Sequence, residues 1–266
     1  MYFSCCIEML FTEYPFAERI YQAKECGFDY VEFWSWEDKD CSAIQKAISE
    51  TGMKVALFQG NTEGRMVDSL DRKRYVAGVR RSVEKAKELG AKQLFLMSDI
   101  MQEDRSVLAC DRFLSDEEKM ESTQKVLEEL IPISEESGIT FLIEPLNTKV
   151  DHKGYSLYHS EPAFQLIREI GHPGIRVLYD AYHMQIMEGN VIDAIRRNVN
   201  EIGYFHIADV PGRCEPGTGE LNYQNILKAL REAGYQGIVG FEFTPSGEQS
   251  GRIAEQTLKQ LKWGIR

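Results

Sequence analysis

The sequence lacks the features that mark membrane-spanning, secreted and nucleic-acid-binding proteins. None of its apolar runs reaches the roughly 18 residues that a transmembrane helix needs. The N-terminal segment has no basic stretch, and Glu8 interrupts its apolar character, so we expect no signal peptide and a cytoplasmic location. The six cysteines form no CxxC pair, which favours free thiols. The formal net charge of −11 disfavours nucleic acids and anionic membranes as partners.

A glycine-rich phosphate loop is also missing after the first apolar segment, which argues against an open doubly wound sheet. Short apolar segments instead alternate with longer amphipathic ones along the whole chain. The apolar segments begin near Phe3, Tyr30, Lys54, Lys92, Thr140, Ile175, Gly203 and Ile238. Glycine ends most of the amphipathic segments, as in KECG, KELG and REAG, where it suits a helix C-terminus. Repeated strand–helix units of roughly 30 residues predict an α/β fold, a single (β/α)₈ TIM barrel over residues 1–266.

Polar residues stand at the C-terminal ends of four consecutive predicted strands, where such barrels keep their active sites. FLIEPLN supplies Glu144, IRVLYDAYH supplies Asp180, YFHIAD supplies His206 and IVGFEF supplies Glu242. A buried carboxylate without a cation is costly, and no basic residue in the fifth, seventh or eighth strand neutralises this group. We therefore expect all four residues to bind one divalent metal ion. Oxygen donors with one imidazole favour Mn²⁺ or Mg²⁺, and Co²⁺ or Zn²⁺ also suits them.

Other residues near the predicted strand ends are candidates for binding a substrate. His183 follows Asp180 by three residues, and Arg213 lies in the polar loop VPGRCEPGTGE. Trp34 and Phe58 follow or end the second and third strands, where they form either a pocket wall or barrel core. Two early glutamates are expected to be structural or to support the site, namely Glu8 and Glu32. Three histidines are expected at the surface, namely His152, His159 and His172.

Several stretches together give the chain a family resemblance. They are MLFTEYPFAERI, GFDYVEFW, IEPLN, YDAYHMQIMEG and VPGRCEPGTGELNY. Through them the chain resembles the hydroxypyruvate isomerase family, within the xylose isomerase-like superfamily of TIM barrels. The resemblance implies that Glu144 and Glu242 are paired catalytic carboxylates that also contact the metal, and that Asp180 and His206 complete the ligand set. It further implies substrate-binding roles for His183 and Arg213, and a homo-oligomer.

The resemblance implies an isomerase that moves a proton next to a carbonyl through an enediolate. The expected substrate is a small hydroxy-keto acid such as hydroxypyruvate. Hydroxypyruvate isomerases often carry Gln at the position of His206, whereas ketose epimerases carry His there, so a ketose 3-epimerase or an aldose–ketose isomerase is an alternative. A further alternative is the catalytic subunit of a lyase that cleaves C-glycosides of 3-keto sugars, with a small partner subunit. A sugar-binding barrel and a metal-dependent DNA-repair nuclease are alternatives from other classes. The paired glutamates disfavour the first, and five histidines with an acidic charge disfavour the second.

Overall fold

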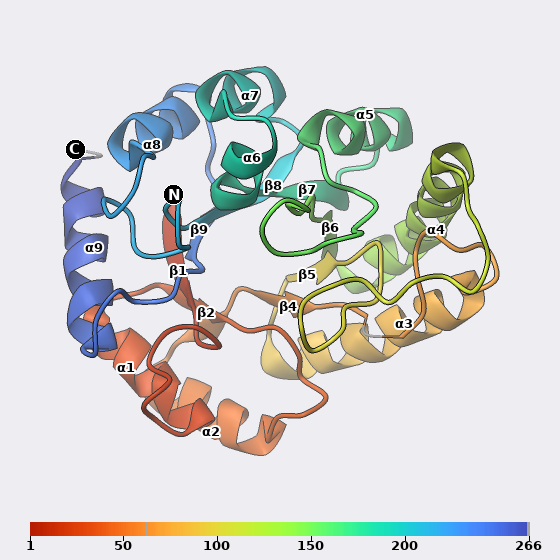
Figure 1. Cartoon of the computed structure of the whole chain (residues 1–266). Helices are drawn as coiled ribbons and strands as arrows, with labels where there is room; N and C mark the ends of the chain where they lie inside the picture. Colours follow the sequence, from red (N-terminus) through yellow and green to blue (C-terminus); the bar gives the residue numbers. More distant parts are fainter. Residues whose placement is uncertain (62, 265–266) are drawn as a thin grey trace.

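Parallel strands form the centre of the computed structural model, which describes residues 1–61 and 63–264. The strands are β1 (Tyr2–Cys6), β2 (Tyr30–Glu32), β3 (Lys54–Val55), β4 (Leu57–Gln59), β5 (Gln93–Leu96), β6 (Thr140–Ile143), β7 (Ile175–Asp180), β8 (Ile202–Ile207) and β9 (Ile238–Phe241). Neighbouring strands pair in the order β3-β2-β1-β9-β8-β7-β6-β5-β4. The helices lie outside this ring, as a TIM barrel requires (Figure 1). The predicted fold class is therefore confirmed.

The third predicted strand differs from expectation because it is divided into β3 and β4. β3 pairs with β2, whereas β4 pairs with β5 on the other side. Ala56 lies between the halves, and its backbone N–H donates to the carbonyl of Val31 at 2.8 Å. The two halves together fill one strand position of the barrel, since each forms backbone hydrogen bonds with a different neighbouring strand. The nine assigned strands thus correspond to the eight strand positions predicted from the sequence.

The helices carry caps at several of their ends. They are η1 (Phe16–Glu18), α1 (Arg19–Cys26), α2 (Cys41–Thr51), α3 (Arg72–Leu89), α4 (Asp116–Ser137), α5 (Ser160–Ile170), α6 (Ala181–Met187), α7 (Val191–Asn198), α8 (Tyr223–Glu232) and α9 (Ser250–Gly264). Gly90 closes α3 with a φ of 74°, in the left-handed region that glycine adopts at low cost. Ser115 and Glu118 form a capping box at the start of α4. Within the described parts of the chain, no helix combines the length and apolar character needed to cross a membrane.

Two long loops close one side of the barrel mouth. The loop after β5 and the loop after β6 lie side by side in Figure 1, where their colours run from yellow to green. The backbone N–H of Val107 donates to the carbonyl of Lys153 at 3.0 Å, which joins the two loops. Asp99 accepts hydrogen bonds from the backbone and the hydroxyl of Ser156, at 2.8 and 3.0 Å. These contacts make the two loops one wall above the C-terminal ends of the strands.

Candidate active site

The four residues predicted to bind a metal converge at the C-terminal end of the barrel. Asp180 ends β7 and His206 lies in β8, while Glu144 and Glu242 directly follow β6 and β9. All four side chains are buried, and one ligand atom from each lies within 4.8 Å of the others. Consecutive parallel strands end at the same edge of the barrel, which explains the convergence. Among the described residues, this is the one group of His, Cys, Asp and Glu side chains that could hold a metal ion.

Asp180 is held in place by one carboxylate oxygen while the other stays open. It caps the N-terminus of α6, where Oδ1 accepts the backbone N–H groups of Tyr182 at 2.7 Å and His183 at 3.3 Å. Oδ2 is buried and accepts no hydrogen bond from any described residue. The nearest groups that could meet it, Nε2 of His183 and Nη2 of Arg213, lie 3.5 and 3.7 Å away, so a closer cation would stabilise this oxygen. This open oxygen therefore fits the role of a metal ligand.

His206 is oriented by a carboxylate on its far side. Its Nε2 lies 2.9 Å from Oε1 of Glu32, and the hydroxyl of Tyr204 donates to the other oxygen of Glu32. Its Nδ1 faces the cluster, 3.2 Å from Oε2 of Glu242 and 3.6 Å from Oε1 of Glu144. A carboxylate behind a ligating imidazole fixes the ring and its tautomer in metal sites. The sequence-based expectation that Glu32 supports the site agrees with this contact.

Gly240 makes room for the pair of Glu32 and His206. A Cβ atom at position 240 would lie 2.7 Å from both carboxylate oxygens of Glu32 and 2.7 Å from Cδ2 of His206. All three would have to shift, because real Cβ atoms do not approach so closely. Glycine in the middle of β9 is therefore required by the close approach of the two side chains.

Arg213 brings a positive charge to the cluster from a loop and not from a strand. It comes from the loop after β8, is only 8% exposed, and its Nη2 lies 2.7 Å from Oε2 of Glu242 and 3.7 Å from Oδ2 of Asp180. The strands indeed carry no neutralising base, but this loop supplies one. Four carboxylates, including that of Glu32, face the single guanidinium of Arg213. A divalent cation, bound through a neutral His206, would offset most of the remaining negative charge.

The two catalytic candidates have different surroundings. Glu242 accepts hydrogen bonds from the indole Nε1 of Trp34 at 2.8 Å and from Arg213 at 2.7 Å. Although burial opposes it, Arg213 and His206 hold the pKa of Glu242 well below its usual range. Burial raises the pKa of Glu144 to about 7. Pairs of carboxyl groups with separated pKa values are typical of acid–base sites, since one is poised to exchange a proton near neutral pH.

His183 lies beside Asp180 with a defined tautomer. Its Nδ1 accepts the backbone N–H of Asn147 at 3.2 Å, and its Nε2 lies 3.5 Å from Oδ2 of Asp180. Burial lowers the pKa of His183 well below its usual range, so the ring is neutral and carries its proton on Nε2. That N–H is the donor that the ring presents to the site.

A cavity of about 390 Å³ opens over the cluster. Three of the four predicted substrate-binding residues, Trp34, His183 and Arg213, line it. Phe58 does not, because it is fully buried and its ring stacks on Phe33 at 5.2 Å between centroids. The next residue, Gln59, lines the cavity instead, as expected from the alternation of side chains along a strand. Phe58 therefore belongs to the barrel core.

The expectation that His152 lies at the surface is wrong. Its side chain is only 9% exposed, lines the cavity, and its ring centroid lies 5.2 Å from that of His183. Burial lowers its pKa to about 4. The loop after β6 has no periodic pattern of polar and apolar residues, so its sequence does not indicate that it folds back over the barrel mouth. His159 and His172 are partly exposed, and their rings lie 3.1 and 3.5 Å from the carboxylates of Glu188 and Glu135.

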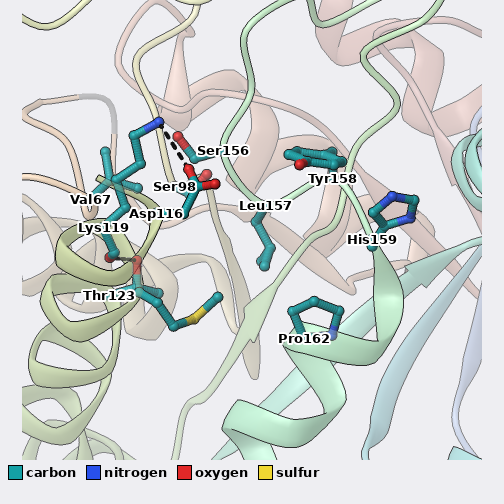
Figure 2. Close-up of a pocket in the computed structure, with 11 residues that line it drawn as sticks. Val67, Ser98, Asp116, Lys119, Thr123, Ser156, Leu157, Tyr158, His159 and Pro162 are labelled. Carbon is teal, nitrogen blue, oxygen red and sulfur yellow. Dashed lines mark hydrogen bonds and ion pairs between the residues drawn. The ribbon is translucent and has the colours of Figure 1, made fainter. Parts of the chain in front are cut away.

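A second hollow of about 200 Å³ lies between the N-terminal parts of α4 and α5 (Figure 2). Lys119 and Asp116 face each other across 3.9 Å on one side of it, and Tyr158 and His159 lie on the other. None of the predicted site residues lines this hollow. The chemistry predicted from the sequence belongs to the cavity at the barrel mouth.

This fold and this site define a class of protein. The pattern that defines the xylose isomerase-like TIM barrel family matches residues 20–263, and the chain belongs to that family. The hydroxypyruvate isomerase of Escherichia coli is 30% identical over 250 residues, which cover 91% of this chain and 93% of the relative. The 2-oxo-tetronate isomerase of Cupriavidus necator is 28% identical over 256 residues, which cover 91% of this chain and 92% of the relative.

Two solved structures resemble the chain along most of its length. One is the protein called AP endonuclease, family 2, from Brucella melitensis, which is 28% identical, covers 98% of both chains and gives a TM-score of 0.86. The other is a 3-keto-D-glucoside 4-epimerase from Escherichia coli, which is 26% identical, covers 93% of this chain and 94% of the other, and gives a TM-score of 0.78. The relatives in sequence and one of these structures thus carry the names of isomerases and epimerases.

Proposed function

We propose that the chain is a divalent-metal-dependent isomerase that moves a proton next to the carbonyl of a small hydroxy-keto acid, with hydroxypyruvate as the first candidate. One observation carries the proposal. Two buried glutamates of opposite protonation tendency, Glu144 and Glu242, meet the open ligand atoms of Asp180 and His206 at the base of one cavity. Proton transfer between neighbouring carbons needs a group that takes a proton and returns it, beside a centre that stabilises the enediolate.

The donor set supports a hard divalent ion such as Mn²⁺ or Mg²⁺, held by Glu144, Asp180, His206 and Glu242. When bound, such an ion acts as a Lewis acid that polarises a carbonyl and stabilises the negative charge of an enediolate. Oδ2 of Asp180 and Nδ1 of His206 are buried without hydrogen-bond partners among the described residues, which supports a role for both atoms as metal ligands.

We assign the proton transfer to Glu144. Burial raises the pKa of Glu144, whereas that of Glu242 is lowered, so Glu144 is the more basic carboxylate of the pair. Its side chain lines the cavity. Trp34 and Arg213 donate hydrogen bonds to the carboxylate of Glu242, whereas neither donates to that of Glu144. Glu242 is held ionised by Arg213 and Trp34, which position it for charge stabilisation. The Nε2–H of His183 is placed to donate to a substrate oxygen beside Asp180.

The class of substrate comes from the relatives. Two proteins that match about nine-tenths of this chain are named as isomerases of hydroxypyruvate and of 2-oxo-tetronate, both short keto acids. Leu146, Phe95 and Met97 contribute apolar wall to the cavity. An enediolate in such surroundings is protected from side reactions.

An epimerase acting on a keto sugar is the second candidate. The name of the 3-keto-D-glucoside 4-epimerase structure favours it, as does an imidazole ligand at position 206. The name of the Brucella structure refers to DNA instead. A net charge of −11 and a cavity floored by carboxylates oppose a phosphate backbone, so we do not adopt that function.

Solvent deuterium tests the proposal directly. The protein is stripped with a chelator, Mn²⁺ is restored, and hydroxypyruvate in D₂O is followed by NMR for conversion to tartronate semialdehyde and for deuterium uptake. Fructose, tagatose and a 3-keto glucoside are run in parallel. We expect conversion of hydroxypyruvate that needs Mn²⁺ and that falls at least 100-fold in Glu144→Gln. Exchange in a ketose alone would transfer the assignment to an epimerase, and exchange in no substrate would refute the proton-transfer function.

A further inference from the structure

The loop after β5 forms a short hairpin at the mouth of the cavity. Met101 and Val107 pair in an antiparallel bridge, and the backbone N–H of Gln102 donates to the carbonyl of Ser106 at 2.8 Å. The backbone N–H of Arg105 donates to the carbonyl of Gln102 at 2.9 Å, and Oδ1 of Asp104 accepts from the backbone of Ser106 at 2.9 Å. The turn is thus held by its own hydrogen bonds and presents residues 102–105 at its tip.

Arg105 occupies a strained position in this turn. Its φ is 67°, in the left-handed region that residues with a Cβ atom rarely adopt. Such a conformation persists where the surroundings fix it, and it is found disproportionately at functional sites. Strain alone assigns no role, so the contacts of the hairpin decide what Arg105 faces.

The hairpin is fixed against the cavity by the loop that carries His152. The backbone N–H of Val107 donates to the carbonyl of Lys153, and the ring Nδ1 of His152 lies 3.3 Å from the carbonyl oxygen of Arg105. His152 in turn stands against His183 inside the cavity. Met101, Gln102 and Arg105 therefore line the cavity from the side opposite the strand ends.

The charges of the lining single out Arg105. Two arginines line the cavity, and Arg213 is already within ion-pair distance of Glu242 and Asp180. The guanidinium of Arg105 makes no hydrogen bond or ion pair with any residue in 1–61 or 63–264. Glu103 lines the same rim, yet it lies outside ion-pair distance of Arg105. Arg105 is thus a cation at the rim of an otherwise anionic cavity, still available to a ligand.

We propose that Arg105 binds the carboxylate of the substrate and thereby makes the site selective for keto acids over uncharged ketoses. A guanidinium offers two parallel N–H donors that match a carboxylate, whereas a hydroxymethyl group in its place gains little from the charge. Because the guanidinium of Arg105 lies at the rim, a keto acid orients with its carboxylate there and its carbonyl towards the cluster. This inference rests on the proposed function for its substrate class.

A matched pair of substrates tests the proposal. Dihydroxyacetone is hydroxypyruvate with the carboxylate replaced by a hydroxymethyl group, and both can be followed by deuterium exchange next to the carbonyl. In Arg105→Met we expect kcat/KM for hydroxypyruvate to fall by about tenfold or more, mainly through a higher KM, while exchange of dihydroxyacetone stays within twofold. Arg105→Lys should recover part of the loss. Arg80→Met removes one exposed positive charge on α3 and should change neither substrate. Equal losses for both substrates in Arg105→Met would overturn the proposal.

A binding measurement separates this inference from the proposed reaction. Glycerate has the carboxylate and lacks the carbonyl, and glycerol is its uncharged counterpart. Calorimetric titration of the Mn²⁺-loaded protein should give a dissociation constant for glycerate that rises about tenfold or more in Arg105→Met and stays unchanged in Arg80→Met. If no substrate reacts but glycerate binding depends on Arg105, the reaction is refuted and the carboxylate site stands. If glycerate fails to bind the wild-type protein, or binds Arg105→Met equally well, the carboxylate site is refuted.

Discussion

Replacement of Glu32 by glutamine tests how the chain orients its imidazole ligand. The side chain of Glu32 is 2% exposed, and its Oε1 lies 2.9 Å from Nε2 of His206. Glutamine has nearly the same volume, and its amide oxygen can take the position of Oε1 facing Nε2. The substitution therefore removes the negative charge and the hydrogen bond from Tyr204, while it leaves the packing beside Gly240 almost unchanged.

The expected size of the effect follows from the role of such a carboxylate. Loss of an outer carboxylate that holds a ligating histidine weakens metal binding by about 10–100-fold, which corresponds to about 1.4–2.7 kcal/mol. Because Glu32 does not line the cavity, substrate binding at saturating metal should change little. We therefore expect a higher dissociation constant for Mn²⁺ with a nearly unchanged KM.

The assay is a titration of metal-free protein with Mn²⁺, followed by calorimetry or by the paramagnetic signal of free Mn²⁺. Asp68→Asn is the matched control, since Asp68 is also buried and is paired, with Arg112 at 2.7 Å, away from the cluster. It should leave the dissociation constant within twofold of wild type. A dissociation constant for Glu32→Gln within that same range, in a protein that still folds, would refute the orienting role of Glu32.

Three further expectations follow from the same contacts. Gly240→Ala places a Cβ atom 2.7 Å from the oxygens of Glu32. Urea unfolding should therefore report about 1–3 kcal/mol of lost stability, and Mn²⁺ should bind more weakly. Unchanged stability would contradict the close packing. Since Glu144 has a pKa of about 7 without metal, Mn²⁺ must displace its proton; calorimetry should detect proton release and an affinity that rises from pH about 5.5 to about 7.5, with a flatter profile in Glu144→Gln. His152 has a folded pKa of about 4, below its ordinary value, so its contribution to stability is complete above pH about 6.5 and is lost as the pH falls through about 4. The loss is up to about 3 kcal/mol, and His152→Asn should lose correspondingly less between pH about 7 and about 4.5; equal losses would argue against a buried neutral ring.

Most of the barrel could be predicted because its signals are local. Alternation of apolar and amphipathic segments defines strands and helices, and glycines such as Gly90 end helices in the left-handed conformation. The division of the third strand into β3 and β4 could not be predicted, because it depends on which neighbour each half pairs with. The sequence of residues 54–59 contains no local pattern that indicates which neighbour each half pairs with.

For the predicted substrate-binding residues too, local signals could be read from the sequence and long-range contacts could not. His183 could be predicted from the sequence because it lies three residues after Asp180, on a helix that Asp180 itself caps. The sequence left Phe58 as either pocket wall or barrel core, because the direction of a side chain at a strand end depends on register, which one position reverses. His152 was misplaced because its loop is fixed by contacts with the hairpin after β5, far away in the sequence.

The sequence by itself determined the four residues of the cluster, Glu144, Asp180, His206 and Glu242. It could do so because each stands at the end of a strand, and parallel strands of a barrel bring their ends to one edge. Only the tertiary structure decided what surrounds them. The contact of Arg213 with Glu242 requires a loop to fold inward, and contacts between distant segments depend on the path of the whole chain rather than on any local pattern.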